Sequence, residues 1–342
     1  MTESNALTTV LGWMQSMVYA GGALFATSLM LLYVYQEKLL YHPSMPGVPK
    51  LTTDNPKGYR HPGEYGIDFE DVYIPTKDGI TIHAWLLKQA NMKQVPTIVF
   101  FHGNAGNIGF RLPNAVQMYR MLGCNIVMVD YRGFGLSLGT PTEKGLQMDA
   151  EATIDYLSMR QDLDNTKFIA FGRSLGGAVA IYLGEARSDK IAAIIVENTF
   201  LSISTMVDSL MPWLSYIKRY VLAIDWSNER RIPSLAHPIL FLSGQKDELV
   251  PPFHMTKLHD IATQSKLRKW YPIARGTHND SWVQGGAPYF DAMRAFIERI
   301  CEMTLENNKK KTDEQVCADG QEIPNMLDST LFQHVKPKDK DV

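Results

Sequence analysis

The feature that most constrains the fold of this chain is a serine flanked by glycines between two apolar runs. Residues 167–171 predict a buried parallel strand, and residues 178–183 predict a helix packed against it. Ser174 falls between them, with Gly172 and Gly176 two positions to either side. This spacing is typical of a strand-to-helix turn so tight that neighbouring side chains would collide, which strains the serine and exposes its hydroxyl. Because the pattern is short, an ordinary strand-to-helix turn is the alternative.

Apolar runs and turn residues predict eight strands. Residues 71–74 and 80–87 flank an Asp-Gly pair at 78–79, a pattern typical of an antiparallel hairpin. Beyond this hairpin, apolar runs alternate with helical patterns, which predicts an α/β fold with a mostly parallel sheet and helices on both faces. Six further strands are expected at 97–101, 125–130, 167–171, 191–196, 239–243 and 268–271.

An apolar excursion at about 200–232 interrupts this alternation and predicts a small helical cap over one edge of the sheet. Two interpretations fit its apolar side chains. They line a pocket for an acyl chain, or they bury themselves on the domain. The side chains concerned are Met206, Leu210, Met211, Trp213 and Leu214.

Composition and charge exclude several classes of protein. The chain has 342 residues, of which 45% are hydrophobic, enough for the core of a large domain. Its net charge of −2, with both signs interspersed, gives no basic surface of the kind that binds nucleic acid. Cys124, Cys301 and Cys317 lack the paired spacing of zinc or redox sites, so we expect ordinary thiols and neither a metal nor a cofactor.

The N-terminal segment differs from the rest of the chain and predicts one transmembrane helix. No charged residue occurs between Glu3 and Glu37, and residues 17–35 form an apolar run of 19 residues. As a helix this run spans roughly 28 Å, close to the ~30 Å hydrocarbon core of a bilayer. A cleaved signal peptide is the alternative, but the run is long and no basic residue precedes it.

The side of the membrane that holds the C-terminal part stays open. Lys38, Lys50, Lys57 and Arg60 follow the apolar run and no Lys or Arg precedes it, a bias that favours a cytosolic C-terminal part. One N-glycosylation pattern occurs at 279–281, beside a candidate catalytic residue where a glycan would block access.

These patterns divide the chain into four segments. Residues 1–40 are expected to form the membrane anchor and residues 41–66 a linker. Residues 67–303 are expected to form the folded domain with its cap. Residues 304–342, which are rich in Lys, Asp, Gln and Pro, are expected to be disordered.

Two further residues complete a candidate catalytic triad with Ser174. Asp247 directly follows an expected strand, at the edge where the serine hydroxyl emerges, and is the favoured acid. His278 lies in the loop after the last strand and, among nine histidines, has the position of a general base. The order of serine, acid and histidine is that of the α/β-hydrolase fold. Glu197, at the end of another strand, is the alternative acid.

The loop at 102–107 predicts an oxyanion hole. Its glycines let the backbone amide of Asn104 approach the serine and act together with the amide of Leu175. We interpret His102 in this loop as structural. Asp130 and Arg132, at the end of a strand, are interpreted as a charged pair that braces loops.

Five motifs together resemble the membrane-anchored serine hydrolases of the α/β hydrolase domain-containing family. They are HGNAGN at 102–107, DYRGFG at 130–135, GRSLGGAVA at 172–180, ENTF at 197–200 and GTHND at 276–280. The resemblance covers about residues 71–302 and extends to the N-terminal anchor. It implies Ser174 as nucleophile, Asp247 as acid and His278 as base, without a cofactor.

The resemblance also implies a substrate class and a set of partners. It suggests ester or thioester substrates, such as palmitoylated protein cysteines or lysophospholipids, so the expected partners are the lipid bilayer and an acylated protein or lipid. Members are usually described with the N-terminus in the cytosol, which conflicts with the charge bias. A serine peptidase on the same fold and a non-catalytic membrane scaffold are the alternatives.

Overall fold

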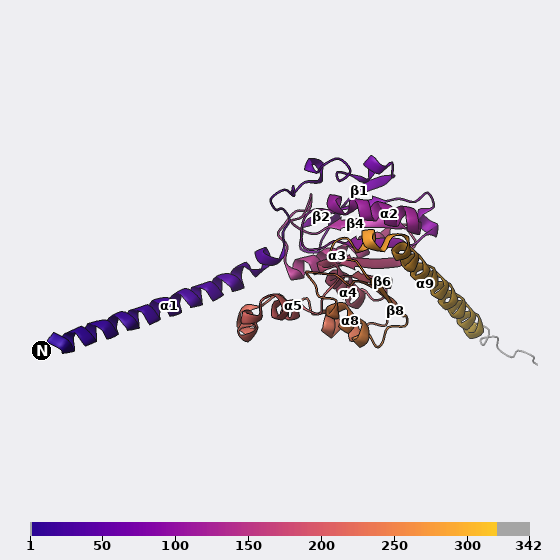
Figure 1. Ribbon diagram of the computed structural model, residues 1–342. Helices are drawn as coiled ribbons and strands as arrows, with labels where there is room; N and C mark the ends of the chain where they lie inside the picture. Colours follow the sequence, from indigo (N-terminus) through magenta and orange to yellow (C-terminus); the bar gives the residue numbers. More distant parts are fainter. Residues whose placement is uncertain (1, 320–342) are drawn as a thin grey trace, which may run out of the picture. The chain divides into compact units, whose positions relative to one another are not determined.

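Eight strands form one sheet, in the order β1-β2-β4-β3-β5-β6-β7-β8, in the computed structural model, which describes residues 2–319 (Figure 1). β1 pairs antiparallel with β2, and β2 with β4, whereas the other neighbouring strands are parallel. The strands are β1 (Phe69–Pro75), β2 (Thr81–Leu87), β3 (Thr97–Phe101), β4 (Asn125–Asp130), β5 (Phe168–Arg173), β6 (Ile191–Glu197), β7 (Ile239–Gly244) and β8 (Arg268–Ile273). All eight predicted strands are confirmed, with ends that differ by at most two residues.

Helices cover both faces of the sheet, which is why its central strands are buried and mostly apolar. Every residue of β3, β4 and β5 is buried. The helices of the domain are α2 (Leu112–Leu122), α3 (Glu143–Met159), α4 (Leu175–Ala186), α8 (Phe253–Ile261) and α9 (Ser281–Asp319). α3, α4 and α8 share one core with Val99 and Phe101. On the other face, Arg294 of α9 donates hydrogen bonds to the carbonyl of Met121 in α2. The α/β-hydrolase fold predicted from the sequence is therefore confirmed.

The carboxyl ends of the parallel strands meet at one edge of the sheet. The loops that follow β3, β5, β7 and β8 at this edge carry Asn104, Ser174, Asp247 and His278 in turn. Open α/β sheets bind ligands outside the carboxyl ends of their strands, where loops from distant parts of the chain converge. The topology therefore gathers the candidate site residues at a single edge.

A helical cap follows β6 at the position expected from the sequence. It consists of α5 (Ile203–Leu210), the 3-10 helix η5 (Pro212–Tyr216) and α6 (Lys218–Val221), and α7 (Asn228–Arg231) leads back toward β7. Ser202 begins α5, and its hydroxyl accepts a hydrogen bond from the amide of Thr205, which is the usual N-cap arrangement.

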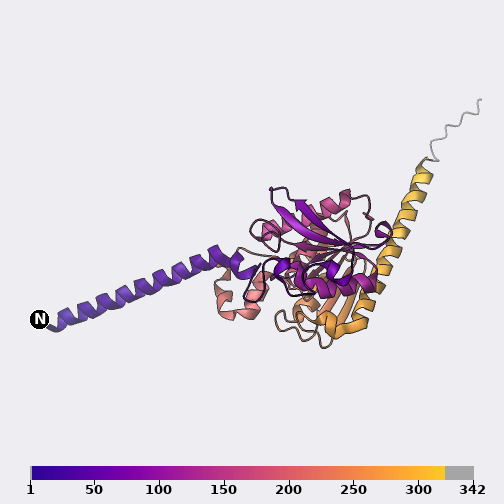
Figure 2. The same cartoon turned by 90° about the horizontal axis from the view of Figure 1, so that it is seen from above.

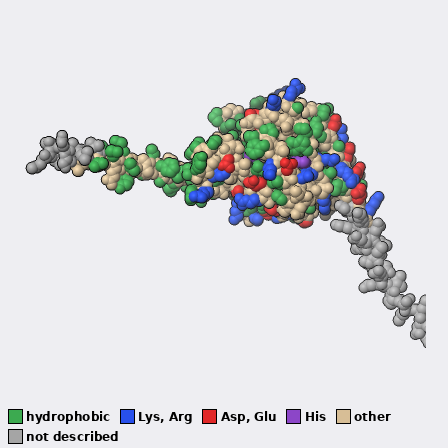
Figure 3. All heavy atoms as spheres, turned by 60° about the horizontal axis from the view of Figure 1, so that its bottom comes forward, with side chains coloured by type: hydrophobic (Ala, Val, Ile, Leu, Met, Phe, Trp, Pro, Cys, Tyr) green, Lys and Arg blue, Asp and Glu red, His purple; other side chains and the backbone are tan. Residues whose placement is uncertain are grey.

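The N-terminal helix α1 (Thr2–Leu40) meets the rest of the domain only at its C-terminal turns, beside the cap (Figures 1 and 2). Its segment Leu11–Leu40 is long and apolar enough to cross a membrane, with a mean hydropathy of 1.7. Figure 3 shows its hydrophobic side chains uncovered along the helix. Exposed apolar side chains on this scale suit a lipid environment rather than water.

The segment after α1 is packed onto the domain at several points. Tyr41 is 3% exposed, and its hydroxyl accepts a hydrogen bond from the indole of Trp226 at the end of the cap. Asn55 lies buried against Asn107, and their side chains exchange hydrogen bonds. The segment expected as a linker therefore belongs to the folded unit.

The C-terminal helix differs from the prediction for the tail. Chain contacts divide the protein into two units, Met1–Cys301 and Glu302–Val342, and α9 continues in the second as far as Asp319. Its backbone breaks at Gly286 (φ 54°), so the regular helix starts near the expected position. Residues 304–319, for which disorder was expected, form part of this helix and contain no Pro or Gly. Residues 320–342 lie outside the described residues.

Candidate active site

Ser174 occupies a strained turn between β5 and α4. Its backbone has φ 55° and ψ −121°, outside the regions that residues with a side chain normally adopt, at a cost of about 1–3 kcal/mol. The flanking glycines are required because a Cβ on Gly172 would lie 2.0 Å from the carbonyl oxygen of Gly176. A Cβ on Gly176 would lie 2.0 Å from the carbonyl oxygen of Phe101. The sequence interpretation of a tight strand-to-helix turn is confirmed.

The favoured acid and base are in direct contact. Nδ1 of His278 lies 2.8 Å from Oδ2 of Asp247, and the two residues are 6% and 8% exposed. Oδ1 of Asp247 accepts hydrogen bonds from the amides of Leu249 (2.9 Å) and Val250 (2.8 Å), which fix the orientation of the carboxylate. Because the acid engages Nδ1, the imidazole keeps Nε2 for proton transfer.

Glu197, the alternative acid, lies away from the histidine. Its carboxylate is fully buried, and Oε2 accepts hydrogen bonds from the guanidinium of Arg173 (3.0 Å) and the hydroxyl of Tyr289 (2.8 Å). Its backbone carbonyl accepts a hydrogen bond from the amide of Ser174 at 2.9 Å. Glu197 therefore stabilises the turn at Ser174. Of the two candidate acids, Asp247 is the one that lies beside His278.

Asn198 connects three parts of the site, and sequence reasoning missed it. Its side-chain nitrogen donates to the carbonyls of Thr277 (3.0 Å) and His278 (3.1 Å) and to the hydroxyl of Ser281 (3.0 Å). Its side-chain oxygen accepts from the amide of Gly244 at 2.7 Å. With φ at 48°, the residue adopts a conformation that asparagine tolerates better than most residues. The ENTF motif contained this residue, but its long-range partners could not be read from the motif.

The two amides expected to form the oxyanion hole lie at the same cavity as the serine. Asn104 and Leu175 both line it, and within the described residues neither backbone N–H donates a hydrogen bond. Asn104 is held by its other groups: the side-chain nitrogen donates to the carbonyl of Leu40 (2.8 Å), and its carbonyl accepts from the amide of His42 (2.9 Å). Both amides are therefore free to donate to a substrate.

His102 stabilises the loop that carries Asn104, and its ring lies buried in the domain. Its ring packs against Tyr131, with ring centroids 4.4 Å apart, and its Nδ1 lies 2.7 Å from the carbonyl oxygen of Gly103. Complete burial lowers the pKa of His102 to about 3, so the ring is neutral at physiological pH. The structural interpretation of this histidine is confirmed.

The expected pair of Asp130 with Arg132 is wrong. Asp130 accepts a hydrogen bond from the amide of Ile108 at 3.0 Å, whereas Arg132 pairs with Asp78 (2.7 Å) and Asp149 (2.8 Å). The two side chains diverge because Arg132 already belongs to the turn beyond β4, and it joins this turn to α3 and to the β1–β2 hairpin. Both residues brace loops, as expected, but with different partners.

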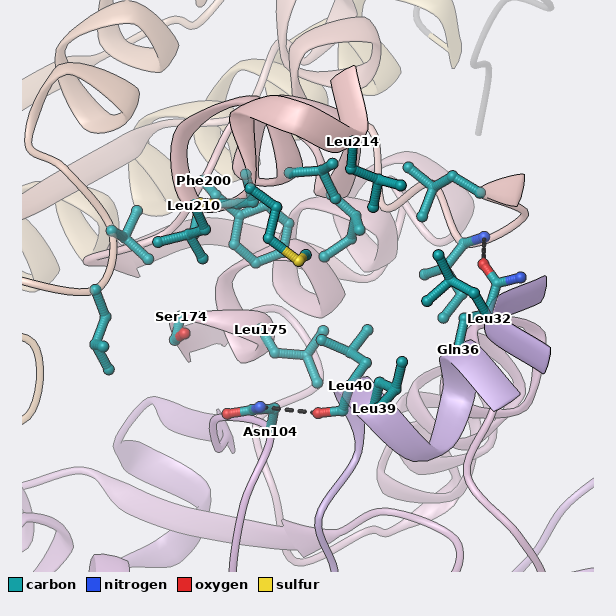
Figure 4. A pocket seen from close by; sticks show the side chains of 18 of the residues that line it. Leu32, Gln36, Leu39, Leu40, Asn104, Ser174, Leu175, Phe200, Leu210 and Leu214 are labelled. Carbon is teal, nitrogen blue, oxygen red and sulfur yellow. Dashed lines mark hydrogen bonds between the residues drawn. The ribbon is translucent and has the colours of Figure 1, made fainter. Parts of the chain in front are cut away.

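Ser174 and His278 open into one cavity of about 340 Å³ (Figure 4). Its lining is apolar except for these two residues, Asn104 and Gln36. The apolar lining residues are Leu32, Leu39, Leu40, Leu175, Phe200, Ile203, Met206, Val207, Leu210, Met211, Leu214, Val221, Leu222, Ile224, Leu249 and Val250. Four of the five cap residues singled out from the sequence thus line the cavity, whereas Trp213 is 65% exposed and does not.

The described residues offer no metal site. No group of three or more His, Cys, Asp or Glu side chains in that part of the chain could hold a metal ion. The polar groups at the cavity are instead a hydroxyl, an imidazole with its carboxylate, and free backbone amides. This set supports nucleophilic acyl chemistry.

The solved structures that this chain resembles share its fold. An esterase of Pyrococcus furiosus, Pf2001, superposes with a TM-score of 0.59 at 17% identity, over 70% of this chain and 95% of that one. An esterase of Pyrobaculum calidifontis superposes with a TM-score of 0.54, also at 17% identity, over 69% of this chain and 86% of that one. At this level of identity the likeness shows the fold alone.

Sequence relatives cover nearly the whole chain. A family model described as alpha/beta hydrolase fold matches residues 96–223. Alpha/beta hydrolase domain-containing protein WAV2 of Arabidopsis thaliana is 36% identical over 84% of this chain and 95% of its own length. Protein bem46 of Schizosaccharomyces pombe is 36% identical, over 82% and 92%. The uncharacterized membrane protein YNL320W of Saccharomyces cerevisiae is 38% identical, over 83% and 97%. The chain belongs to the α/β hydrolase domain-containing family.

Proposed function

We propose that this protein is a membrane-anchored serine hydrolase that cleaves an ester or thioester of a lipid-like acyl group. The observation that carries the proposal is the composition of the cavity. Ser174, His278 and the amides of Asn104 and Leu175 converge on it, and apolar side chains form the rest of its lining. Burial of an acyl chain there gains about 0.8 kcal/mol per methylene group.

In the proposed reaction, Ser174 attacks the acyl carbonyl. Nε2 of His278 removes the proton from the hydroxyl, and Asp247, which bonds Nδ1 at 2.8 Å, stabilises the imidazolium that forms. The amides of Asn104 and Leu175 donate to the carbonyl oxygen as it becomes negative, and each such donor contributes about 3 kcal/mol to the transition state.

The acyl-enzyme forms when the tetrahedral intermediate collapses: the bond from the acyl carbon to the alcohol or thiol breaks, and the imidazolium donates its proton to that leaving group. Water then enters the position that the leaving group has vacated. Neutral His278 removes a proton from that water as it attacks the acyl carbonyl, and the proton finally returns to Ser174. Neither half of the reaction requires a redox step or a cofactor.

Two features support the membrane anchor. Leu11–Leu40 is long and apolar enough to cross a bilayer, and one relative of similar length is described as a membrane protein.

Within the family, the HGNAGN and GRSLGG motifs favour the branch around α/β hydrolase domain-containing protein 13. Relatives with these motifs include enzymes that act on palmitoylated cysteines and on lysophospholipids, so we propose one of these two acyl substrates.

The serine itself provides the test. Ser174→Ala should lose both hydrolysis of acyl esters and covalent labelling by a fluorophosphonate, with a fall in kcat on the order of 10⁶ as in comparable triad enzymes. Ser209→Ala, a matched exchange on the cap with its hydroxyl bonded only to a helix carbonyl, should retain both. Unchanged hydrolysis by Ser174→Ala would refute the nucleophile.

The same assay separates the alternatives. Labelled peptides cleaved in preference to acyl esters and thioesters would identify a peptidase, although the apolar lining does not favour a peptide backbone. A wild-type protein that is folded but takes no fluorophosphonate label would be a non-catalytic scaffold.

A further inference from the structure

The C-terminal turns of α1 are fixed to the cap by one buried side chain. Oε1 of Gln36 accepts hydrogen bonds from the amides of Ala223 (2.7 Å) and Ile224 (2.9 Å), and its Nε2 donates to the carbonyl of Val221 (3.3 Å). Gln36 is 8% exposed. An amide that is satisfied at both ends in a buried place fixes two elements in register. The end of α1 is therefore a part of the cap and more than a tether.

One face of this end of α1 lines the cavity. Leu32, Gln36, Leu39 and Leu40 follow a spacing of four, three and one residues, which places them on the same side of a helix. Figure 4 shows these side chains along one side of the cavity, with Asn104 beside Leu40 and Ser174 farther along. Leu39 lines the cavity and is also 62% exposed, so the cavity reaches the surface beside α1.

Apolar packing continues from this wall into the cap. Leu29 and Leu32 of α1 pack against a small cluster formed by Val207, Leu214 and Val221. The surface around this contact carries the side chains that are enriched at lipid–water boundaries. Tyr33 and Tyr35 on α1 and Trp213 and Tyr216 on the cap are all exposed, by 53%, 45%, 65% and 85%.

The same end of α1 also reaches the catalytic machinery. The carbonyl of Leu40 accepts a hydrogen bond from the side chain of Asn104, and the amide of His42 donates to the carbonyl of Asn104. The residue that supplies an oxyanion donor is thus held by the last residue of α1 and by His42, two residues further along the chain. A continuous apolar path therefore runs from the exposed surface of α1 to the reacting atoms.

We propose that residues 32–40 of α1 form one wall of the acyl-binding site, and that a long acyl chain enters it directly from the bilayer that holds α1. This inference rests on the proposed hydrolase function and deepens it. A chain that moves along α1 exchanges lipid contacts for the leucines of the wall and stays out of water, whereas a short acyl group at Ser174 extends along less of the wall. The substrate is accordingly an ester or thioester with one long straight acyl chain anchored in the same membrane.

The test compares acyl chains of different length on the full-length protein in phosphatidylcholine vesicles. The probes are p-nitrophenyl palmitate and p-nitrophenyl butyrate, and the readout is the ratio of their kcat/KM values. Leu32→Trp and Leu39→Trp should lower this ratio at least about tenfold, since a hydrophobic pocket discriminates by about 10 to 200-fold per methylene group. Leu31→Trp is the matched control, because Leu31 is 51% exposed and does not line the cavity.

Each outcome decides the proposal. A ratio unchanged in both lining variants, or lowered equally in Leu31→Trp, would overturn it. If a Trp variant does not fold, as judged by loss of fluorophosphonate labelling, Leu32→Ala and Leu39→Ala replace it; they remove apolar contacts and should also lower the ratio. Failure of the hydrolase proposal looks different, because wild-type protein would then cleave neither ester and Ser174 would take no label.

Discussion

The sheet edge that carries Ser174, Asp247 and His278 and the α1–cap wall enclose the same cavity but are held together by different forces. At the edge, hydrogen bonds of 2.7–3.1 Å that Asn198 and Asp247 make with Gly244, Thr277, His278 and Ser281 connect segments that follow different strands. At the wall, leucine and valine side chains pack together, and Gln36 supplies the polar contact. Hydrogen bonds are directional and fix reacting atoms, whereas apolar contact is non-directional and accepts chains of varied shape. The edge thus suits chemistry, and the wall suits selection of the acyl group.

Among changes that leave Ser174 in place, the largest expected effect comes from replacing the acid at the edge. Asp247→Asn removes the charge that stabilises the imidazolium, and kcat should fall about 10⁴-fold, as in a comparable triad. Glu197→Gln should leave kcat within an order of magnitude but lower the stability by about 3–5 kcal/mol, because Arg173 then loses its buried charged partner. Steady-state kinetics and thermal unfolding in detergent measure the two effects. A larger fall in kcat for Glu197→Gln would assign the catalytic acid to β6.

A smaller fall in kcat should follow when the hydrogen bonds that Asn198 makes between the loops are removed. Asn198→Ala leaves the amide of Gly244 and the carbonyl of His278 without this partner. Each unsatisfied buried group costs about 1–3 kcal/mol. If this free energy displaces the loop that carries His278 and raises the activation barrier by the same amount, kcat falls roughly 10 to 100-fold. Asn279→Ala, an exposed neighbour of His278, is the control and should change kcat less than twofold. Equal effects of the two substitutions would exclude a special role for Asn198.

The sequence predicted those features of the edge that depend on residues close together in the chain or on the apolar pattern of single strands. The glycines around Ser174 are required by contacts within the turn itself and with the neighbouring strand, so a short motif reports the geometry. Strands could be placed to within two residues because every position of the central ones is buried and most are apolar. Asp247 and His278 could be placed at this edge because each follows a strand that ends there.

Other contacts were not predictable because the sequence does not show which way a side chain points at the end of a strand. Glu197 lies at the same edge of the sheet as Ser174, but its carboxylate bonds Tyr289. Arg132 pairs with Asp149 and not with its neighbour Asp130. Partners far apart in sequence are harder still, since Gln36 and the cap amides it binds are separated by 187 and 188 residues. The apolar run of α1 predicted a membrane helix, and nothing local indicated that its last turns would line a catalytic cavity.

The smallest effect on the reactivity of Ser174 should come from removing the hydrogen bonds that hold α1 to the cap. Gln36→Leu keeps the apolar character of α1 but leaves the buried amides of Ala223 and Ile224 without an acceptor, at about 1–3 kcal/mol each. We expect faster proteolysis within residues 203–222 in detergent micelles, while labelling of Ser174 by a fluorophosphonate continues because the acid, base and serine are held by other bonds. Gln15→Leu is the control, since Gln15 bonds only Tyr19 on the exposed part of α1. Unchanged proteolysis of Gln36→Leu would mean that apolar packing alone holds α1 against the cap, and loss of labelling would mean that the wall and the edge form one cooperative unit.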